Sequence, residues 1–361
     1  MFRQRTWNRK LLQAHSVDMR QFAGAQPAVL PNGMRFIQAY NTSGLRFSVL
    51  PDRGLDIWMA DYRGVPLTWL SRGAPYPPDF GQTWLQQFNG GLLTTCGLTH
   101  VGPPERQQTS DSRGGIHGPY SRLRADAVTY QSGWTTADAY HVEIAAEIAQ
   151  AGLFAEQLVL ARTYAFNLTD PVVHLTDTVT NLGDTAAPLM VLYHVNLGYP
   201  LLSDGSQLLV SSTVYPRDDT ARAGLATWDT YASATPGYTE QVFFHHLKLS
   251  NSIARVALVN GDFGLSLEWD SRQMPYLSQW KYTRQGTYVA ALEPGNCIPE
   301  GQHAARENGR LRMLQPGNTA CFQLRIAVLD SAEAVNALRA AINEELHQGA
   351  PISACKLDDY A

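Results

Sequence analysis

Five strand signals follow one another between residues 122 and 200, with only short turns between them. They are rich in Val, Ile, Thr and Tyr, which favour strands, and they read RLRADAVTY, HVEIAAEI, EQLVLARTYAFN, VVHLTDTVTNL and PLMVLYHVNLGYP. The turns at 167–170 and 181–184 suit hairpins and leave no room for the crossover helices that parallel strands need. The pattern predicts consecutive antiparallel strands and excludes a doubly wound fold.

Further strand signals stand on both sides of this block. MRFIQAY, LRFSVL and LDIWMADYRGVPLTWL precede it, and QVFFHHLKL, ARVALVN, LSLEWD, TYVAALE and CFQLRIAVLD follow it. Residues 215–237 lose the alternation and predict an extended loop. With 44% hydrophobic and 17% charged residues, the chain can bury a large core. We therefore expect one all-β domain over residues 1–361, with residues 1–33 as an N-terminal extension.

One segment, residues 331–346, has a convincing helical pattern. At its start, Asp330 and Glu333 have the spacing of a capping box. Its apolar positions recur every three to four residues, which predicts a single stripe against the core. That stripe consists of Val335, Leu338, Ile342 and Leu346.

Charge and composition limit the partners. The net charge of −4 gives no broad attraction for nucleic acid or an acidic membrane surface. The N-terminus has no apolar core of signal-peptide length, and no run approaches the length of a membrane span. The four cysteines are widely separated without a CxxC pair. We expect a cytoplasmic protein with reduced thiols and a small neutral or charged ligand. The oligomeric state is not predicted.

The first of three polar segments that could carry binding or catalytic groups is residues 89–120, NGGLLTTCGLTHVGPPERQQTSDSRGGIHGPY. Its seven glycines and three prolines predict structured loop, where binding and catalytic groups tend to lie. It carries His100 and His117. Alternatively, the glycines and prolines only mark turns and each histidine is a satisfied polar residue.

The second segment, YHVNLGYP, places His194 and Asn196 on one strand face by the two-residue period. In a strand rich in Leu, Met and Val, these side chains either find partners in the interior or face a pocket. The third segment ends the apolar strand TYVAALE with Glu293. A carboxylate there is costly unless it is paired or functional, or unless it reaches solvent where Pro294 turns the chain.

Nearby in the third segment, Gln279, Trp280 and Lys281 combine a ring with polar groups, as is common where sugars stack, although Trp280 could equally be core. Serine-nucleophile and phosphate-loop motifs are missing from the sequence. A metal site could be assembled from histidines and Glu293, but no HxH or HExxH spacing supports it. We expect neither a metal nor a cofactor.

The order of these groups resembles the aldose 1-epimerase (galactose mutarotase-like) family: a histidine in a Gly-rich loop, a histidine ending a central strand and a glutamate ending a late strand. The resemblance covers roughly residues 34–330 and is closest to a poorly characterised branch, on the segments GLTHVGPP, GGIHGPY, YHVNLGYP and ALEPGN. It implies a large two-sheet antiparallel β-sandwich with a groove on one sheet, in which His117, His194 and Glu293 match the family's site residues.

The resemblance also implies a reaction. Glu293 would be the base and His194 the acid that interconvert sugar anomers by ring opening and reclosure, with His117 orienting the ring oxygen. The expected substrate-binding residues are His100, Arg113, Asn196, Gln279, Trp280 and Lys281. Arg113 is the candidate for the family's arginine, and the family's sugar-binding aspartate has no match.

The chain departs from the family where mutarotases read His-Ser-Tyr-Phe-Asn and Glu-Thr-Gln, because it has Val195 after His194 and Pro294 after Glu293. The sugar or sugar derivative, whether neutral, acidic or phosphorylated, therefore stays open. Two alternatives stay open with it: another sugar or sugar-acid isomerase on the same scaffold, and a carbohydrate-binding protein without catalysis.

Overall fold

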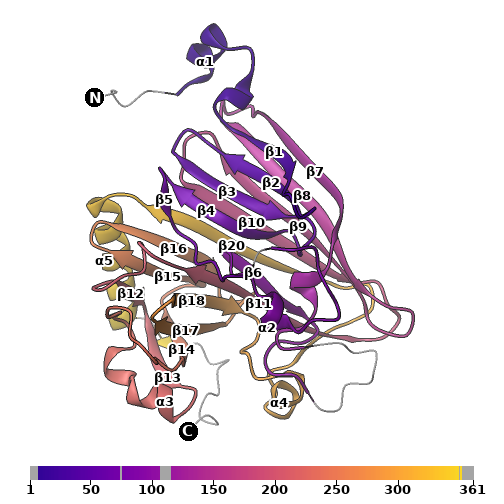
Figure 1. Cartoon of the computed structure of the whole chain (residues 1–361), viewed down its shortest axis with the longest axis vertical. Helices are drawn as coiled ribbons and strands as arrows, with labels where there is room; N and C mark the ends of the chain where they lie inside the picture. Colours follow the sequence, from indigo (N-terminus) through magenta and orange to yellow (C-terminus); the bar gives the residue numbers. More distant parts are fainter. Residues whose placement is uncertain (1–6, 74, 106–114, 349, 352–361) are drawn as a thin grey trace.

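The structure is a computed structural model that describes residues 7–73, 75–105, 115–348 and 350–351. Three antiparallel sheets carry most of the chain (Figure 1), so the all-β expectation is confirmed. Within the described residues no helix is long and apolar enough to cross a membrane.

The five consecutive strand signals correspond to β7 (Ala125–Trp134), β8 (Tyr140–Ala151), β9 (Gln157–Asn167), β10 (Val172–Asn181) and β11 (Ala187–Leu197). The first four pair in chain order as antiparallel neighbours. The prediction is wrong at the last step, because β11 does not pair with β10 and instead enters a different sheet. The short turn before β11 is thus a crossing between sheets.

The first large sheet has the order β12-β15-β16-β20-β10-β9-β8-β7. Its remaining strands are β12 (Gln207–Val210), β15 (Ile253–Asn260), β16 (Phe263–Asp270) and β20 (Thr319–Leu329). The second has the order β13-β14-β17-β18-β11-β19, and β6 also pairs with β11 and β21 with β14. Its strands besides β11 are β6 (Leu93–Leu98), β13 (Ser212–Pro216), β14 (Gln241–Leu249), β17 (Tyr276–Arg284), β18 (Thr287–Gly295), β19 (Arg312–Leu314) and β21 (Ala350–Pro351).

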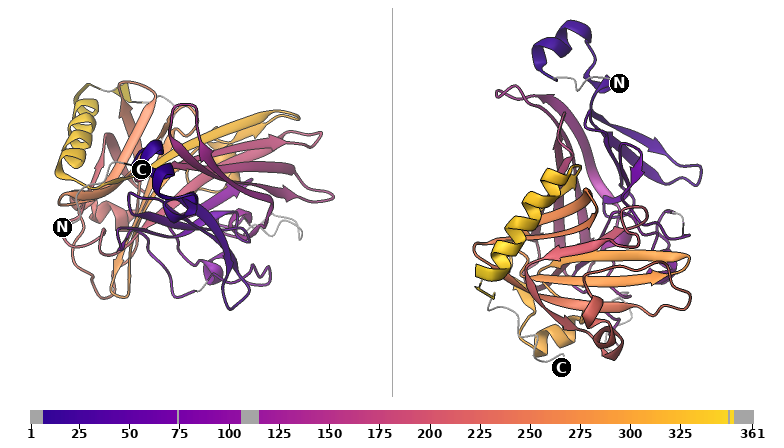
Figure 2. Two further views of the ribbon diagram at one scale, coloured as in Figure 1. Left: turned by 90° about the horizontal axis from the view of Figure 1, so that it is seen from above. Right: turned by 90° about the vertical axis from the view of Figure 1, so that its left-hand side faces the viewer.

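A third, five-stranded sheet stands to one side of the two large ones (Figure 2). It contains β1 (Gly24–Val29), β2 (Arg35–Tyr40), β3 (Leu45–Leu50), β4 (Asp56–Tyr62) and β5 (Val65–Pro66) in chain order. β1 belongs to the segment that we expected to be an N-terminal extension. The helices are α1 (Arg9–His15), α2 (Trp84–Gln87), α3 (Asp219–Ala223), α4 (Gln302–Glu307) and α5 (Ala332–Gln348). α3 lies in the segment that we expected to be loop.

The C-terminal helix is confirmed, but two details of its prediction are wrong. The Ser331 hydroxyl, at 3.3 Å, accepts the hydrogen bond from the Ala334 amide at its start. Asp330 instead accepts a hydrogen bond of 2.6 Å from the hydroxyl of Tyr62. Val335 and Ile342 are buried against β12 and β15, whereas Leu346 is 39% exposed.

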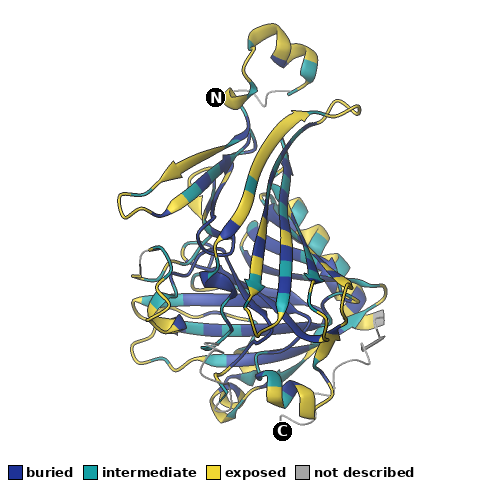
Figure 3. Ribbon diagram, turned by 90° about the vertical axis from the view of Figure 1, so that its right-hand side faces the viewer, coloured by how far each residue is buried: buried dark blue, intermediate teal, exposed yellow. Residues whose placement is uncertain are grey.

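Buried residues gather where the two large sheets face each other (Figure 3). At the centre lies the fully buried guanidinium of Arg162 on β9, which donates two hydrogen bonds of 2.9 and 2.7 Å to Asp177 on β10. It also donates to Asp56 on β4 at 2.7 Å and to Thr95 on β6 at 2.8 Å. Asp177 accepts a further hydrogen bond of 2.6 Å from Tyr193 on β11. The guanidinium thus connects four strands, and Asp177 adds β11 as a fifth.

Arg162→Met should lower the free energy of unfolding by about 3–5 kcal/mol, because two buried carboxylates lose their cation. Urea denaturation would measure the change. The control is Arg272→Met, since Arg272 is 77% exposed in its pair with Asp270 and its removal should cost no more than about 1 kcal/mol. Equal effects of the two substitutions would contradict a central role for Arg162.

Candidate active site

The site lies on the face of the second sheet that is turned away from the sandwich core. Along β11, Tyr193 and Val195 belong to the core, so His194 and Asn196 point the other way by the two-residue period. The pairing of Val195 with Leu292 puts His194 directly opposite Glu293 on β18. Both residues therefore lie side by side on one face, although they are far apart in sequence.

His194 and Glu293 form a buried pair. The His194 Nε2 and Glu293 Oε1 atoms are 3.3 Å apart, and the residues are 5% and 4% exposed. Burial raises the pKa of the Glu293 carboxyl above its ordinary value, while His194 and then Arg217 oppose that rise. A glutamate with a raised pKa is a stronger base than an exposed one. The His194 Nδ1 atom is buried without a partner among the described residues.

His117 approaches this pair from the Gly-rich loop. Its ring centroid is 6.1 Å from that of His194 and 4.9 Å from the ring of Trp84. Its backbone has φ 62°, a left-handed conformation that non-glycine residues rarely adopt, and hydrogen bonds with Gly97 and Gly102 hold it there. Burial of the ring, followed by the charges of His194 and His100, lowers the pKa of His117 to about 3. The imidazole is thus neutral near pH 7.

Three aromatic rings contact the two histidines, and of these only Trp280 was predicted from the sequence. Trp84 and Phe88 stack with centroids 4.5 Å apart, and we call this pair the aromatic wall. Phe88 and Trp280 each contact the His194 ring edge to face, with ring centroids 5.6 Å apart. Trp69 contacts both Phe88 and Trp280. These rings could provide stacking faces for a sugar.

A charged pair borders the site beside Trp280. The indole nitrogen of Trp280 donates to Glu240 at 2.8 Å, and Arg217 donates to the same carboxylate at 3.0 Å. Both charged residues are partly exposed, and both influence the pKa of Glu293. Arg217 lies in the segment that we expected to be loop and Glu240 shortly after it, so no local pattern identified them.

The remaining predicted residues lie at different distances from the pair. His100 is buried, and its Nε2 is 2.8 Å from the Pro103 carbonyl oxygen. Asn196 shares the site face but uses its amide nitrogen to donate to the carbonyls of Gly91 and His194. Arg113 lies outside the described residues.

Gln279 and Lys281 are not brought to the site. They alternate with Trp280 along β17 and therefore face the opposite side of the sheet. Gln279 donates to the Trp228 carbonyl and the Tyr231 hydroxyl. Lys281 donates to two backbone carbonyls, and burial lowers its pKa to about 8. Both side chains hold residues 227–231 against the back of the sheet.

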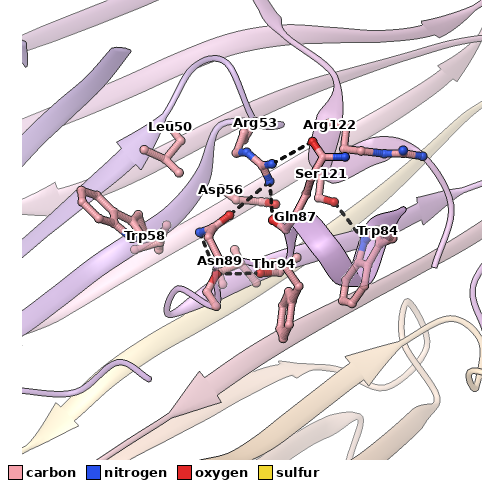
Figure 4. Close-up of a pocket in the computed structure, with 14 residues that line it drawn as sticks. Leu50, Arg53, Asp56, Trp58, Trp84, Gln87, Asn89, Thr94, Ser121 and Arg122 are labelled. Carbon is pink, nitrogen blue, oxygen red and sulfur yellow. Dashed lines mark hydrogen bonds between the residues drawn. The ribbon is translucent and has the colours of Figure 1, made fainter. Parts of the chain in front are cut away.

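A small cavity lies beside the aromatic wall (Figure 4). Arg53, Gln87, Asn89 and Thr94 are among the residues that line it. Its volume of ≈ 10 Å³ is enough for about one water molecule, so it is too small to hold a sugar. In the part of the chain that the structure describes, no group of three His, Cys, Asp or Glu side chains is arranged to hold a metal ion.

Comparison with known proteins supports the family resemblance. A family model described as a domain of unknown function (DUF4432) matches residues 31–328. A protein from Klebsiella pneumoniae that is provisionally assigned as an aldose 1-epimerase has a TM-score of 0.82 and 26% identity, covering 88% of this chain and 85% of its own. No protein of curated function matches the sequence.

Two further structures are similar at lower identity. A galactose mutarotase-like protein from Clostridium acetobutylicum has a TM-score of 0.57 and 15% identity, covering 86% of this chain and 99% of its own. The galactose 1-epimerase from Lactobacillus acidophilus has a TM-score of 0.55 and 13% identity, covering 83% of this chain and 95% of its own. The fold is therefore the galactose mutarotase-like sandwich.

The low pKa of His117 predicts a loss of stability in acid. In the unfolded chain His117 binds a proton with its ordinary pKa of 6.5, whereas in the folded protein its pKa is about 3. The free energy of unfolding should therefore fall as the pH decreases through that window and stay level above it. Urea titrations at several pH values should show a shallower decline for His117→Asn than for the wild type.

Two comparisons make this measurement specific. Burial also lowers the pKa of His245, to about 4. Because the wild type and His117→Asn both contain His245, its contribution to the pH dependence cancels when the two are compared. The exposed His15 of α1 provides the control, because His15→Asn should leave the pH dependence unchanged. A wild-type slope in His117→Asn would show that the folded protein does not keep this imidazole neutral.

Proposed function

Because this chain belongs to the DUF4432 family and pairs a buried glutamate with a histidine inside an aromatic site, we propose that it is an aldose 1-epimerase-type enzyme. It binds a small sugar or sugar derivative and interconverts its two anomers. The observation that carries the proposal is the contact of 3.3 Å between His194 and Glu293 on the outward face of the sheet.

The reaction needs one proton removed from the C1 hydroxyl and one delivered to the ring oxygen. Glu293 takes the hydroxyl proton as the bond between C1 and the ring oxygen breaks, and that oxygen keeps the electron pair and accepts a proton from His194. After rotation about the C1–C2 bond, the same oxygen attacks the other face of the carbonyl. It then returns its proton to His194 while Glu293 reprotonates the C1 oxygen, and the site is restored.

The surroundings suit this division of roles. The raised pKa of Glu293 strengthens it as a base, and in the ion-pair form His194 carries the proton that the ring oxygen needs. His117 is neutral because its pKa lies at about 3, so it does not compete for that proton. It acts as a hydrogen-bonding partner that orients the ring oxygen.

The rings and the charged border fit the binding of a sugar. Phe88 and Trp280 both contact His194 and offer apolar faces for sugar C–H groups, while Glu240 and Arg217 offer hydrogen-bonding groups at the edge. A panel of neutral sugars, sugar acids and sugar phosphates, assayed for accelerated anomer exchange by polarimetry and exchange NMR, tests the proposal. Binding without acceleration for every compound would contradict it.

The same panel separates mutarotation from other sugar chemistry. Mutarotation moves only oxygen-bound protons, so in deuterated water no deuterium should enter a carbon position. Incorporation at a carbon atom next to the carbonyl would instead indicate an isomerase or epimerase that uses the same acid and base.

Glu293→Gln should lower kcat for anomer exchange by about 10²–10⁴-fold, because the amide keeps the shape of the side chain but accepts no proton. The measurement is exchange NMR on the best substrate, with thermal unfolding to confirm the fold. The matched control is Glu268→Gln, since Glu268 pairs with Arg255 on the other sheet and should leave the rate unchanged. Wild-type exchange by Glu293→Gln would remove this residue from the mechanism.

A further inference from the structure

The side chain of Arg53, in the turn between β3 and β4, is buried and lies beside Gln87 and Asn89 (Figure 4). It donates four hydrogen bonds to one segment of the chain. Its Nε donates to the Tyr76 carbonyl at 3.0 Å, and one terminal nitrogen donates to the Gln87 carbonyl and the Asn89 side chain, each at 3.1 Å. The other terminal nitrogen donates to the Gln87 side chain at 3.3 Å.

All four acceptors are neutral, which is unusual for a buried arginine. Among the described residues no carboxylate forms an ion pair with Arg53, and burial lowers its pKa to about 10. The charge of Asp56 opposes part of this decrease, so the cost of burying the cation is only partly compensated. What arginine offers here is its planar fork of donors, which reaches several acceptors at once and which lysine cannot reproduce.

The two residues that Arg53 holds, Gln87 and Asn89, flank Phe88 in the sequence. Phe88 stacks on Trp84 at 4.5 Å and contacts His194 at 5.6 Å. α2 has only four residues and is too short to be stable by itself. The place of the aromatic wall therefore depends on contacts made by its flanks.

We propose that Arg53 is a positioning residue of the active site, whose fork holds the aromatic wall against His117 and His194. Trp84 packs on the His117 ring at 4.9 Å and helps to exclude water from it. Without the fork, the wall moves away and the ring becomes solvated. The kinetic consequence rests on the proposed function, whereas the solvation of His117 does not.

The test is the titration of His117 by NMR, followed through its imidazole C–H signals, in the full-length protein. In the wild type the pKa of His117 should lie at about 3. In Arg53→Met it should rise toward the ordinary value of 6.5, because the ring gains water. Arg53→Lys should give an intermediate rise, and it carries the test if Arg53→Met does not fold.

A purely structural role would give a different result. Loss of thermal stability in the folded variants with an unchanged His117 titration would overturn the proposal. The matched control is Arg35→Met, because Arg35 pairs with Asp52 at 2.6 Å in the same turn but does not contact residues 76–89. It should leave His117 unchanged, and a shift as large as that of Arg53→Met would also overturn the proposal.

Anomer exchange supplies the second readout. With a sugar that the wild type accepts, Arg53→Met should lower kcat/KM by at least about tenfold, as expected for a misplaced site wall, and Arg53→Lys should recover part of it. If the wild type accelerates no sugar, the proposed function fails while the titration still decides the role of Arg53. If the titration is unchanged and the wild type is active, only the role of Arg53 fails.

Discussion

The buried guanidinium of Arg162 is the contact on which the rest of the structure depends. It binds Asp177 and Asp56 at once and so ties strands from all three sheets around one charge. One guanidinium and two carboxylates inside a core are tolerated only when every polar atom finds a partner. The hydroxyl of Tyr193 completes the set by donating to Asp177. Because Tyr193 must face inward, its neighbour His194 must face outward, and the core therefore sets the orientation of the site.

The strands were largely predictable, because turn residues separate short runs rich in β-branched and aromatic residues. The crossing of β11 into the second sheet was not, because the turn before it has the length and composition of a hairpin. The long-range pairing of β11 with β6 and β18 places it in the second sheet and not in a hairpin with β10. No local sequence pattern contains that information. The same limit applies to α3, a helix of five residues within a segment that has no alternation.

The candidate site was predictable where chemistry and strand period coincide. His194 and Glu293 are costly polar groups in apolar strands, and they form a buried pair. For Gln279 and Lys281 the prediction of a place at the site is wrong. They alternate with Trp280 along β17, so Trp280 lies at the site and they lie on the other face. That separation could have been inferred from the two-residue period alone. The aromatic wall could not, because its position depends on Arg53, more than thirty residues earlier in the chain.

Burial shifts the pKa values of the carboxyl and imidazole groups at this site in opposite directions. Loss of water raises the pKa of Glu293 and lowers that of His117, because it disfavours the charged form of each. His194 lies between them, 3.3 Å from the carboxylate and 6.1 Å, ring to ring, from the second imidazole. Burial therefore disfavours a positive charge on His117, while His194 is the imidazole in contact with the carboxylate. In the proposed mechanism, the aromatic rings that bury these groups thereby influence which side chains exchange a proton with the sugar.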